Sequence, residues 1–207
     1  MDPLLLQAAR DAIGFMPDDE GLALYQEALI ASARGPLLEV GGYCGKSAIY
    51  LGAAAARAGS LLFSIDHHRG SEENQAGQEY HDPRLLGSDG RLDTLPHFRT
   101  AISAAGLEEA VVAVVGRSAT VAASWQTPLA MLFIDGGHSQ EAVDADFDGW
   151  TRHLLPAGSL AIHDVFPDPR DGGRPPFVVY LRALESGDYE EVSEVGSLRI
   201  LRRRPPG

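Results

Sequence analysis

The stretch from Pro36 to Ser47 constrains the fold more than any other part of this 207-residue chain. A short apolar run that carries Glu39 is followed by three glycines, and an apolar-periodic segment, 48–58, comes next. This order is typical of a strand, a tight turn and a helix. Glycines let the backbone approach a ligand closely, and the N–H groups that open the helix can face its polar groups. The stretch therefore predicts a nucleotide-binding turn.

The same alternation of apolar runs and helical periodicity continues along the chain. Two short helices are expected first, followed by strands that alternate with helices and by a closing antiparallel pair with Gly196 in its turn. The expected helices are 4–13, 20–33, 48–58, 95–105, a short one after Ser118 to about 124, 139–155 and 177–184. The expected strands are 36–40, 61–66, 111–115, 129–135, 159–164, 190–193 and 197–201. This pattern predicts an α/β, Rossmann-like doubly wound sheet of seven strands, mostly parallel, with a C-terminal antiparallel hairpin.

The length fits one domain over residues 1–207, with N-terminal helices in 1–35. Residues 67–93 differ from the rest, because polar side chains crowd a segment broken by glycine and proline. They include His67, His68, Arg69, Glu72, Glu73, Asn74, Gln75, Gln78, Glu79, His81, Asp82 and Asp93. A polar excursion of this length after a strand is expected to be an insert that covers the site as a lid.

Composition excludes several classes of partner. The formal net charge is −12, which argues against nucleic acid and anionic membranes because those partners need clustered lysine and arginine. No apolar run approaches the roughly 20 residues that span a bilayer. The single cysteine, Cys44, excludes an internal disulfide and suits a reducing compartment. We therefore expect a cytoplasmic protein with no nucleic-acid or membrane partner.

Three ligands compete for the glycine turn. A phosphate loop is indicated by Gly45-Lys46-Ser47, but Val40 stands where its leading glycine is needed. A dinucleotide site is indicated by Asp66, which could bind ribose, but the glycines do not fit G-x-G-x-x-G. S-adenosylmethionine is a cationic nucleoside that needs carboxylates rather than a phosphate cradle. Glu39, which would repel a phosphate, and Asp66 both favour this third ligand.

The segment from Leu38 to Ser47 resembles the first motif of class I S-adenosylmethionine methyltransferases. It is especially similar to the catechol O-methyltransferase version, E-L-G-A-Y-C-G-Y-S, and the similarity extends from about residue 36 to 166. The resemblance implies that the glycine turn lies under the methionine part of the cofactor, that the acid after the second strand binds its ribose, and that Ser118 contacts its adenine. The cofactor-binding residues expected on this basis are Glu39, Gly41, Tyr43, Gly45, Ser47, Asp66, Ser118 and Asp135.

Ionisable side chains also end two later strands, as Asp135-Gly136-Gly137-His138 and His163-Asp164. Neighbouring strand tips can bring Asp135 and Asp164 onto one cation. Carboxylates favour Mg²⁺ or Ca²⁺, whereas an imidazole from His163 would favour Mn, Fe or Zn. Each residue also has a plain structural interpretation: a turn cap for Asp135, a solvated side chain for His138 and a core histidine for His163.

The resemblance narrows these choices. Catechol-type O-methyltransferases carry D-x-x-K and D-N, in which the acids and the asparagine bind Mg²⁺ and the lysine is the base. This chain has D-x-x-H and H-D, and the first of these is more similar to sugar-directed O-methyltransferases of antibiotic pathways, in which histidine is the base. The resemblance implies that Asp135 and Asp164 bind the metal, with His163 as a further expected ligand, and that His138 is the catalytic base.

The sequence thus predicts an enzyme that uses S-adenosylmethionine and a divalent metal to methylate a hydroxyl of a small molecule. Mg²⁺ is the favoured metal and Mn²⁺ is the alternative. A sugar or glycoside is favoured over a catechol or phenol, because histidine replaces lysine and the insert is polar. The other interpretations are a noncatalytic cofactor-binding module and a phosphate-loop nucleotide hydrolase. By analogy with the family, a homodimer or larger oligomer is expected.

Overall fold

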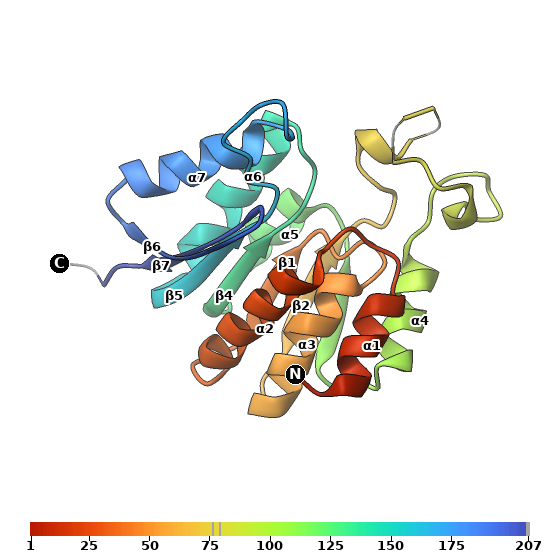
Figure 1. The fold of residues 1–207 in the computed structure, drawn as a ribbon, viewed down its shortest axis with the longest axis horizontal. Helices are drawn as coiled ribbons and strands as arrows, with labels where there is room; N and C mark the ends of the chain where they lie inside the picture. Colours follow the sequence, from red (N-terminus) through yellow and green to blue (C-terminus); the bar gives the residue numbers. More distant parts are fainter. Residues whose placement is uncertain (76, 79, 206–207) are drawn as a thin grey trace.

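A computed structural model describes residues 1–75, 77–78 and 80–205. Its centre is one seven-stranded sheet in the order β3-β2-β1-β4-β5-β7-β6 (Figure 1). The strands are β1 (Leu37–Val40), β2 (Leu62–Asp66), β3 (Val111–Val115), β4 (Leu129–Ile134), β5 (Leu154–Ile162), β6 (Tyr189–Val195) and β7 (Leu198–Arg203). The first five strands pair in parallel, and β7 runs antiparallel to both β5 and β6. The predicted sheet and its hairpin are confirmed.

Helices cover both faces of the sheet. The helices are α1 (Pro3–Asp11), α2 (Asp18–Ser32), α3 (Lys46–Ala58), α4 (Leu95–Ala104), α5 (Ser118–Ser124), α6 (Gln140–Trp150) and α7 (Pro175–Glu185). The core on one face is built from α1 to α4, and the core on the other from α5 to α7 (Figure 1). Neighbouring strand residues alternate between the two, since Leu37 packs in the first core and Leu38 in the second. All residues of β1 and β4 are therefore buried, as in other parallel strands, and all of them except Glu39 are apolar.

The segment between β2 and α4 is a folded insert at one end of the sheet (Figure 1). It contains two short 3₁₀ helices, η1 (Glu72–Asn74) and η2 (Pro83–Leu85), and the bridge between Leu86 and Leu92. Its two ends are joined because the Thr94 N–H donates to the His68 carbonyl at 3.1 Å and the Thr94 hydroxyl lies 2.8 Å from His68 Nδ1. Glu79, which the sequence counted among the polar residues of this segment, lies outside the described residues.

The expected boundary between α6 and β5 was wrong, and β5 covers Leu154–Ile162 instead of the expected 159–164. The helix predicted over 139–155 ends at Trp150, and a 3₁₀ turn, η3 (Thr151–His153), separates it from β5. Leu154 is already a strand residue, paired with Leu129. An apolar leucine fits a buried helix face and a buried strand equally well, so periodicity alone does not separate them.

Helices with the length and apolarity needed to cross a membrane are absent from the described residues.

Candidate functional site

The carboxyl ends of β1, β4 and β5 lie side by side, which brings the predicted site residues to one edge of the sheet. Backbone hydrogen bonds continue the pairing past the strands: Asp135 N–H donates to the Val40 carbonyl at 2.9 Å, and His163 N–H to the Ile134 carbonyl at 3.1 Å. Ligands of open parallel sheets bind at this edge. The local fold therefore fixes the positions of the residues that follow each strand.

The glycine turn after β1 packs directly against the residue that ends β4. Gly41 has a φ of +97°, and a side chain there would overlap the backbone carbonyl of Asp135. Gly45, with a φ of +94°, caps the amino end of α3 in the left-handed conformation. Both positions favour glycine, and the close contact at Gly41 joins the two halves of the predicted site.

Asp66, at the end of β2, holds the turn in place. One carboxylate oxygen accepts the Tyr43 N–H at 2.8 Å, and the other accepts the His68 N–H at 2.7 Å. Tyr43 itself has a φ of +42°. The structure thus brings Gly41, Tyr43 and Asp66 together, as expected for a cofactor turn, and binding of ribose by Asp66 stays a prediction.

Glu39 and Ser47 lie beneath the turn and contact each other. The Glu39 carboxyl is fully buried and accepts hydrogen bonds from the hydroxyls of Ser47 at 2.9 Å and Ser64 at 2.6 Å. Burial raises the pKa of Glu39 to about 7, against the effect of the two serine hydroxyls. These contacts support the turn from below, and the direct cofactor contacts expected for Glu39 and Ser47 stay predictions.

Ser118 begins α5 and is tied to α6. Its hydroxyl accepts a hydrogen bond from Trp150 Nε1 at 2.7 Å and donates to the buried carboxyl of Asp146. Burial raises the pKa of Asp146 to about 6, against the effect of that hydrogen bond. The sequence reasoning missed Asp146, which lies beside Gly136 of the loop after β4. The adenine contact predicted for Ser118 stays a prediction.

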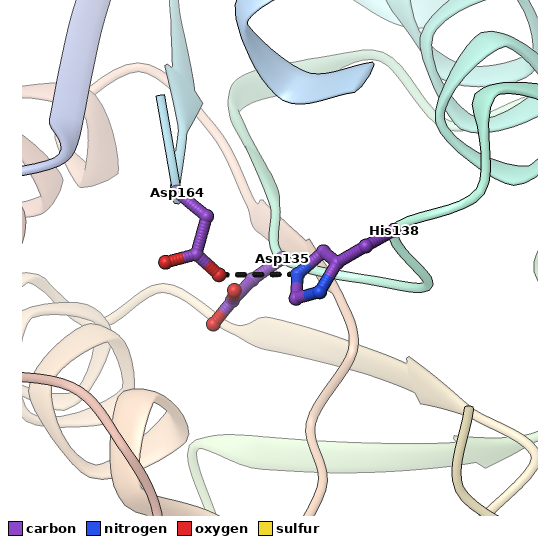
Figure 2. Close-up of side chains that lie close together, drawn as sticks. All are labelled: Asp135, His138 and Asp164. Carbon is purple, nitrogen blue, oxygen red and sulfur yellow. Dashed lines mark ion pairs between the residues drawn. The ribbon is translucent and has the colours of Figure 1, made fainter. Parts of the chain in front are cut away.

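Asp135, His138 and Asp164 converge at the ends of β4 and β5 (Figure 2). Each offers one ligand atom, and these three atoms all lie within 4.8 Å of one another. Among the residues that the structure describes, no other group of three acidic, histidine or cysteine side chains is arranged in this way. The side chains of Asp135, His138 and Asp164 are 21%, 30% and 28% exposed, so a small ligand can reach them. The two carboxylates are donors that suit Mg²⁺ or Mn²⁺.

His138 lies between two acids. Its Nε2 is 3.1 Å from Asp164 Oδ2, the contact dashed in Figure 2, and its Nδ1 is 2.9 Å from Glu73 Oε2 of η1. The hydrogen bond to Asp164, with that to Glu73, raises the pKa of His138 to about 9 against the effect of burial. The same bond and that from His163 outweigh burial and hold the pKa of Asp164 well below its usual range.

His163 was expected as a further metal ligand, but it is not one of the three converging residues and its ring lies between two carboxylates. It is only 6% exposed, and both its ring nitrogens face carboxylates: Nδ1 is 3.0 Å from Asp135 Oδ1, and Nε2 is 2.6 Å from Glu20 Oε2 of α2. These acids raise the pKa of His163 well above its ordinary value, although burial alone would lower it. With both nitrogens engaged, His163 supports the cluster from behind, and Glu20 is a site residue that the sequence reasoning missed.

Unusual backbone conformations gather at the same edge. Four non-glycine residues in the described part of the chain have a positive φ, and three of them, Tyr43, His68 and Asp164, closely follow β1, β2 and β5. Such conformations cost about 1–3 kcal/mol each and persist where the surrounding structure holds them. Their position marks the edge where the predicted site residues converge.

Comparison with known proteins places this arrangement in a family. The model of a methyltransferase domain family matches residues 38–165, which include β2 to β5, all of β1 except Leu37, and both halves of the site. The whole fold is similar to the O-methyltransferase TomG from Streptomyces achromogenes, which is involved in tomaymycin synthesis and was solved in complex with SAM. The TM-score is 0.66 at 17% identity, over 99% of this chain and 91% of that one.

Two further solved structures share the fold. The O-methyltransferase from Bacillus cereus in complex with SAH has a TM-score of 0.66 at 17% identity, over 99% of this chain and 92% of that one. The O-methyltransferase NovP has a TM-score of 0.63 at 16% identity, over 89% of this chain and 78% of that one. Since the family model covers more than half of the sequence, this chain belongs to the methyltransferase family, as its glycine turn predicted.

Proposed function

We propose that this chain is an S-adenosylmethionine-dependent, divalent-metal-dependent O-methyltransferase that acts on a hydroxyl of a small molecule, preferentially a sugar or glycoside. The observation that carries the proposal is the contact between Gly41 and the Asp135 carbonyl. It places a predicted cofactor turn directly beside the Asp135–His138–Asp164 cluster. A methyl donor and an acceptor oxygen held at these two places would be neighbours.

The glycine turn is the proposed cofactor site. SAM is bound in the TomG structure and SAH in the Bacillus cereus structure, which supports the same ligand here. S-adenosylmethionine supplies a methyl group activated by its sulfonium. Asp66 fixes the turn through the Tyr43 N–H and its own loop through the His68 N–H, and we assign it the ribose hydroxyls as well. Gly41, Tyr43 and Gly45 let the backbone approach the methionine part.

Asp135 and Asp164 are the proposed metal ligands. A divalent cation bound there would lower the pKa of the acceptor hydroxyl, as a protein-bound zinc lowers that of water from about 16 to about 7. Mg²⁺ is favoured, with Mn²⁺ as the alternative, because carboxylate oxygens dominate the donor set.

His138 is the proposed general base. Glu73 accepts the hydrogen bond from Nδ1, so Nε2 is the nitrogen that faces the acid cluster and can receive the proton. The carboxylate that raises the His138 pKa most belongs to Asp164, which is also a proposed metal ligand. We therefore expect His138 to have its proton-accepting form near neutral pH only in the metal-loaded site.

The insert of residues 67–93 is the proposed cover of the acceptor site. Glu73 brings η1 onto His138, and the insert around it carries many polar side chains, among them Arg69, Gln75 and His81. These are hydrogen-bonding side chains that suit a polyol better than an aromatic ring. They support a sugar or glycoside as the acceptor.

The net charge of −12 supports a small-molecule acceptor over nucleic acid or an anionic membrane. A homodimer or larger oligomer is proposed by family analogy, and a cytoplasmic location is supported by the single cysteine, Cys44, which is buried and free.

A methyl-transfer screen tests this function. The protein would be incubated with methyl-labelled S-adenosylmethionine, Mg²⁺ or Mn²⁺, and panels of sugars, glycosides, catechols and phenols, with the products identified by mass spectrometry. We expect an O-methylated sugar or glycoside. Methylation of phenols alone would overturn the proposed acceptor class. Tight cofactor binding with no transfer to any acceptor would favour a noncatalytic module.

A further inference from the structure

A buried acid from the N-terminal part of the chain reaches the back of the proposed metal site. Glu20, in the first turn of α2, is 3% exposed, and its Oε2 lies 2.6 Å from His163 Nε2. The two residues are 143 positions apart in the sequence. On the opposite side of the ring, His163 Nδ1 lies 3.0 Å from Asp135 Oδ1 and 3.5 Å from Asp164 Oδ1. One imidazole therefore connects Glu20 with both acids of the cluster.

The turn between β6 and β7 is built around the same carboxylate. The Ser197 N–H donates to Glu20 Oε1 at 2.6 Å, and a side chain at Gly196 would overlap Glu20. The Ser197 carbonyl in turn accepts the N–H of Val165, the residue after Asp164, at 3.0 Å. The turn thus fixes Glu20 and the backbone beside Asp164 together, so three separate parts of the chain meet behind the cluster.

Fold stability alone explains this arrangement poorly. Moving two charges into a protein interior costs several kcal/mol per ion, and well-packed apolar residues in place of a buried ion pair are often as stable or more so. Neutral imidazoles and carboxylates that bind metals are commonly oriented by a second layer of hydrogen bonds, whose loss costs 10- to 100-fold in affinity. Glu20 and His163 have the geometry of such a layer.

We propose that Glu20 is a positioning residue which, through His163, orients Asp135 and thereby sets the affinity of the Asp135–Asp164 site for a divalent cation. This inference rests on the proposed function, since it needs a cation at that site. His163 then acts as a spacer between Glu20 and the ligand carboxylates. Replacing Glu20 should change metal binding without any change at the cofactor turn.

Binding of Mn²⁺ to the full chain, followed by electron paramagnetic resonance of the free ion, tests the inference without an activity assay. We expect Glu20→Ala to weaken Mn²⁺ affinity about 10- to 100-fold. Glu20→Gln should stay within about threefold of the wild type, because its amide can accept from the Ser197 N–H and donate to His163 Nε2 while Nδ1–H still donates to Asp135. Rescue by this conservative variant separates positioning from charge.

Glu27→Ala is the matched control. Glu27 also lies on α2, is largely buried and pairs with Arg202 at 2.7 Å, but its contacts with Arg202 and Ser159 do not include the cluster. We expect this variant to lower the melting temperature and leave Mn²⁺ affinity unchanged. If Glu20→Ala does not fold, Glu20→Met fills the same space without a hydrogen-bonding group and should show the same loss.

The outcomes are distinguishable. Equal Mn²⁺ affinity in the wild type and in Glu20→Ala, or equal losses in Glu20→Ala and Glu27→Ala, would overturn the positioning role while the metal site stands. A wild type that binds no Mn²⁺ would overturn the inference together with the metal site that it rests on. Asp135→Asn, which removes a proposed ligand, provides the reference for complete loss.

Discussion

The backbone and the side chain of Asp135 face different parts of the site. Its backbone carbonyl packs against Gly41 of the turn, and its carboxylate faces His163 and the ligand cluster. Glu39, on the neighbouring strand β1, is buried and accepts hydrogen bonds from two serine hydroxyls. Individual side chains here have roles that can be separated by substitution, because each has a distinct set of contacts.

His138→Ala should remove the base and little else. Loss of a general base costs about 10²–10⁴-fold in rate, so we expect kcat to fall by that factor while calorimetry shows unchanged affinity for S-adenosylmethionine. His97→Ala, on α4 and distant in sequence from the cluster, is the control and should keep the wild-type kcat. Wild-type turnover by His138→Ala would remove His138 from the mechanism.

Glu39 should make stability depend on pH. Its folded pKa of about 7 lies above the ordinary value of 4.5, so the folded state resists ionisation, and stability falls as the pH rises from about 4.5 to 7. The full penalty above pH 7 is about 3 kcal/mol. Glu39→Gln removes this penalty. The melting temperature of the variant minus that of the wild type should therefore be more positive at pH 8 than at pH 5. Glu108 is exposed, so Glu108→Gln should change the melting temperature by the same amount at pH 5 and at pH 8. If Glu39→Gln also changes it equally at both pH values, the raised pKa of Glu39 is contradicted.

The elements that carry these residues are held by close contacts at the edge of the sheet. The turn after β1 touches the end of β4, and η1 of the insert touches the loop that begins α6. Both contacts bring together segments that are far apart in the sequence. Each contact depends on two elements, so a substitution that disrupts it should alter the positions of both.

Gly41→Ala should separate the turn from β4. Gly59→Ala is a matched control, since Gly59 also has a positive φ but has open space around it. The control costs only its backbone conformation, about 1–2 kcal/mol. Gly41→Ala adds an overlap with the Asp135 carbonyl worth about 1–3 kcal/mol more. We expect a larger loss of melting temperature in differential scanning calorimetry and weaker cofactor binding; equal losses would show that the contact is unimportant.

Glu73→Ala should release His138 from the insert. Without the acceptor for Nδ1–H, the imidazole loses its fixed orientation, and we expect kcat to fall about 10-fold with little change in KM for the methyl donor. Glu73→Gln keeps an acceptor and should recover most of the rate. Glu72→Ala, at the exposed neighbouring position, is the control. A fall in Glu72→Ala as large as in Glu73→Ala would assign the effect to the insert in general.

Across the whole molecule, the sequence predicted the features that depend on short stretches of chain and on the general rules of parallel sheets. Apolar runs and helical periodicity indicated the sheet and its hairpin, and the rule that parallel strands end at one edge correctly predicted that Asp135 and Asp164 lie together. Glu20 was missed as a site residue, and Glu73 was expected in the lid but not as the partner of His138. Their partners lie 143 and 65 residues away, and nothing in the sequence around them marks a pairing. His163 lies after the strand where it was expected, but its ring contacts Glu20, which no local pattern in the sequence indicates.

The central claim is that the turn and the acid cluster act as one metal-dependent site. The initial rate of methyl transfer from S-adenosylmethionine to the acceptor, measured against free Mg²⁺ after treatment with EDTA, tests it most directly. We predict that EDTA abolishes transfer, that added Mg²⁺ or Mn²⁺ restores it, and that Asp164→Asn shifts the restoring concentration upward. Full transfer in the presence of excess EDTA would contradict the claim.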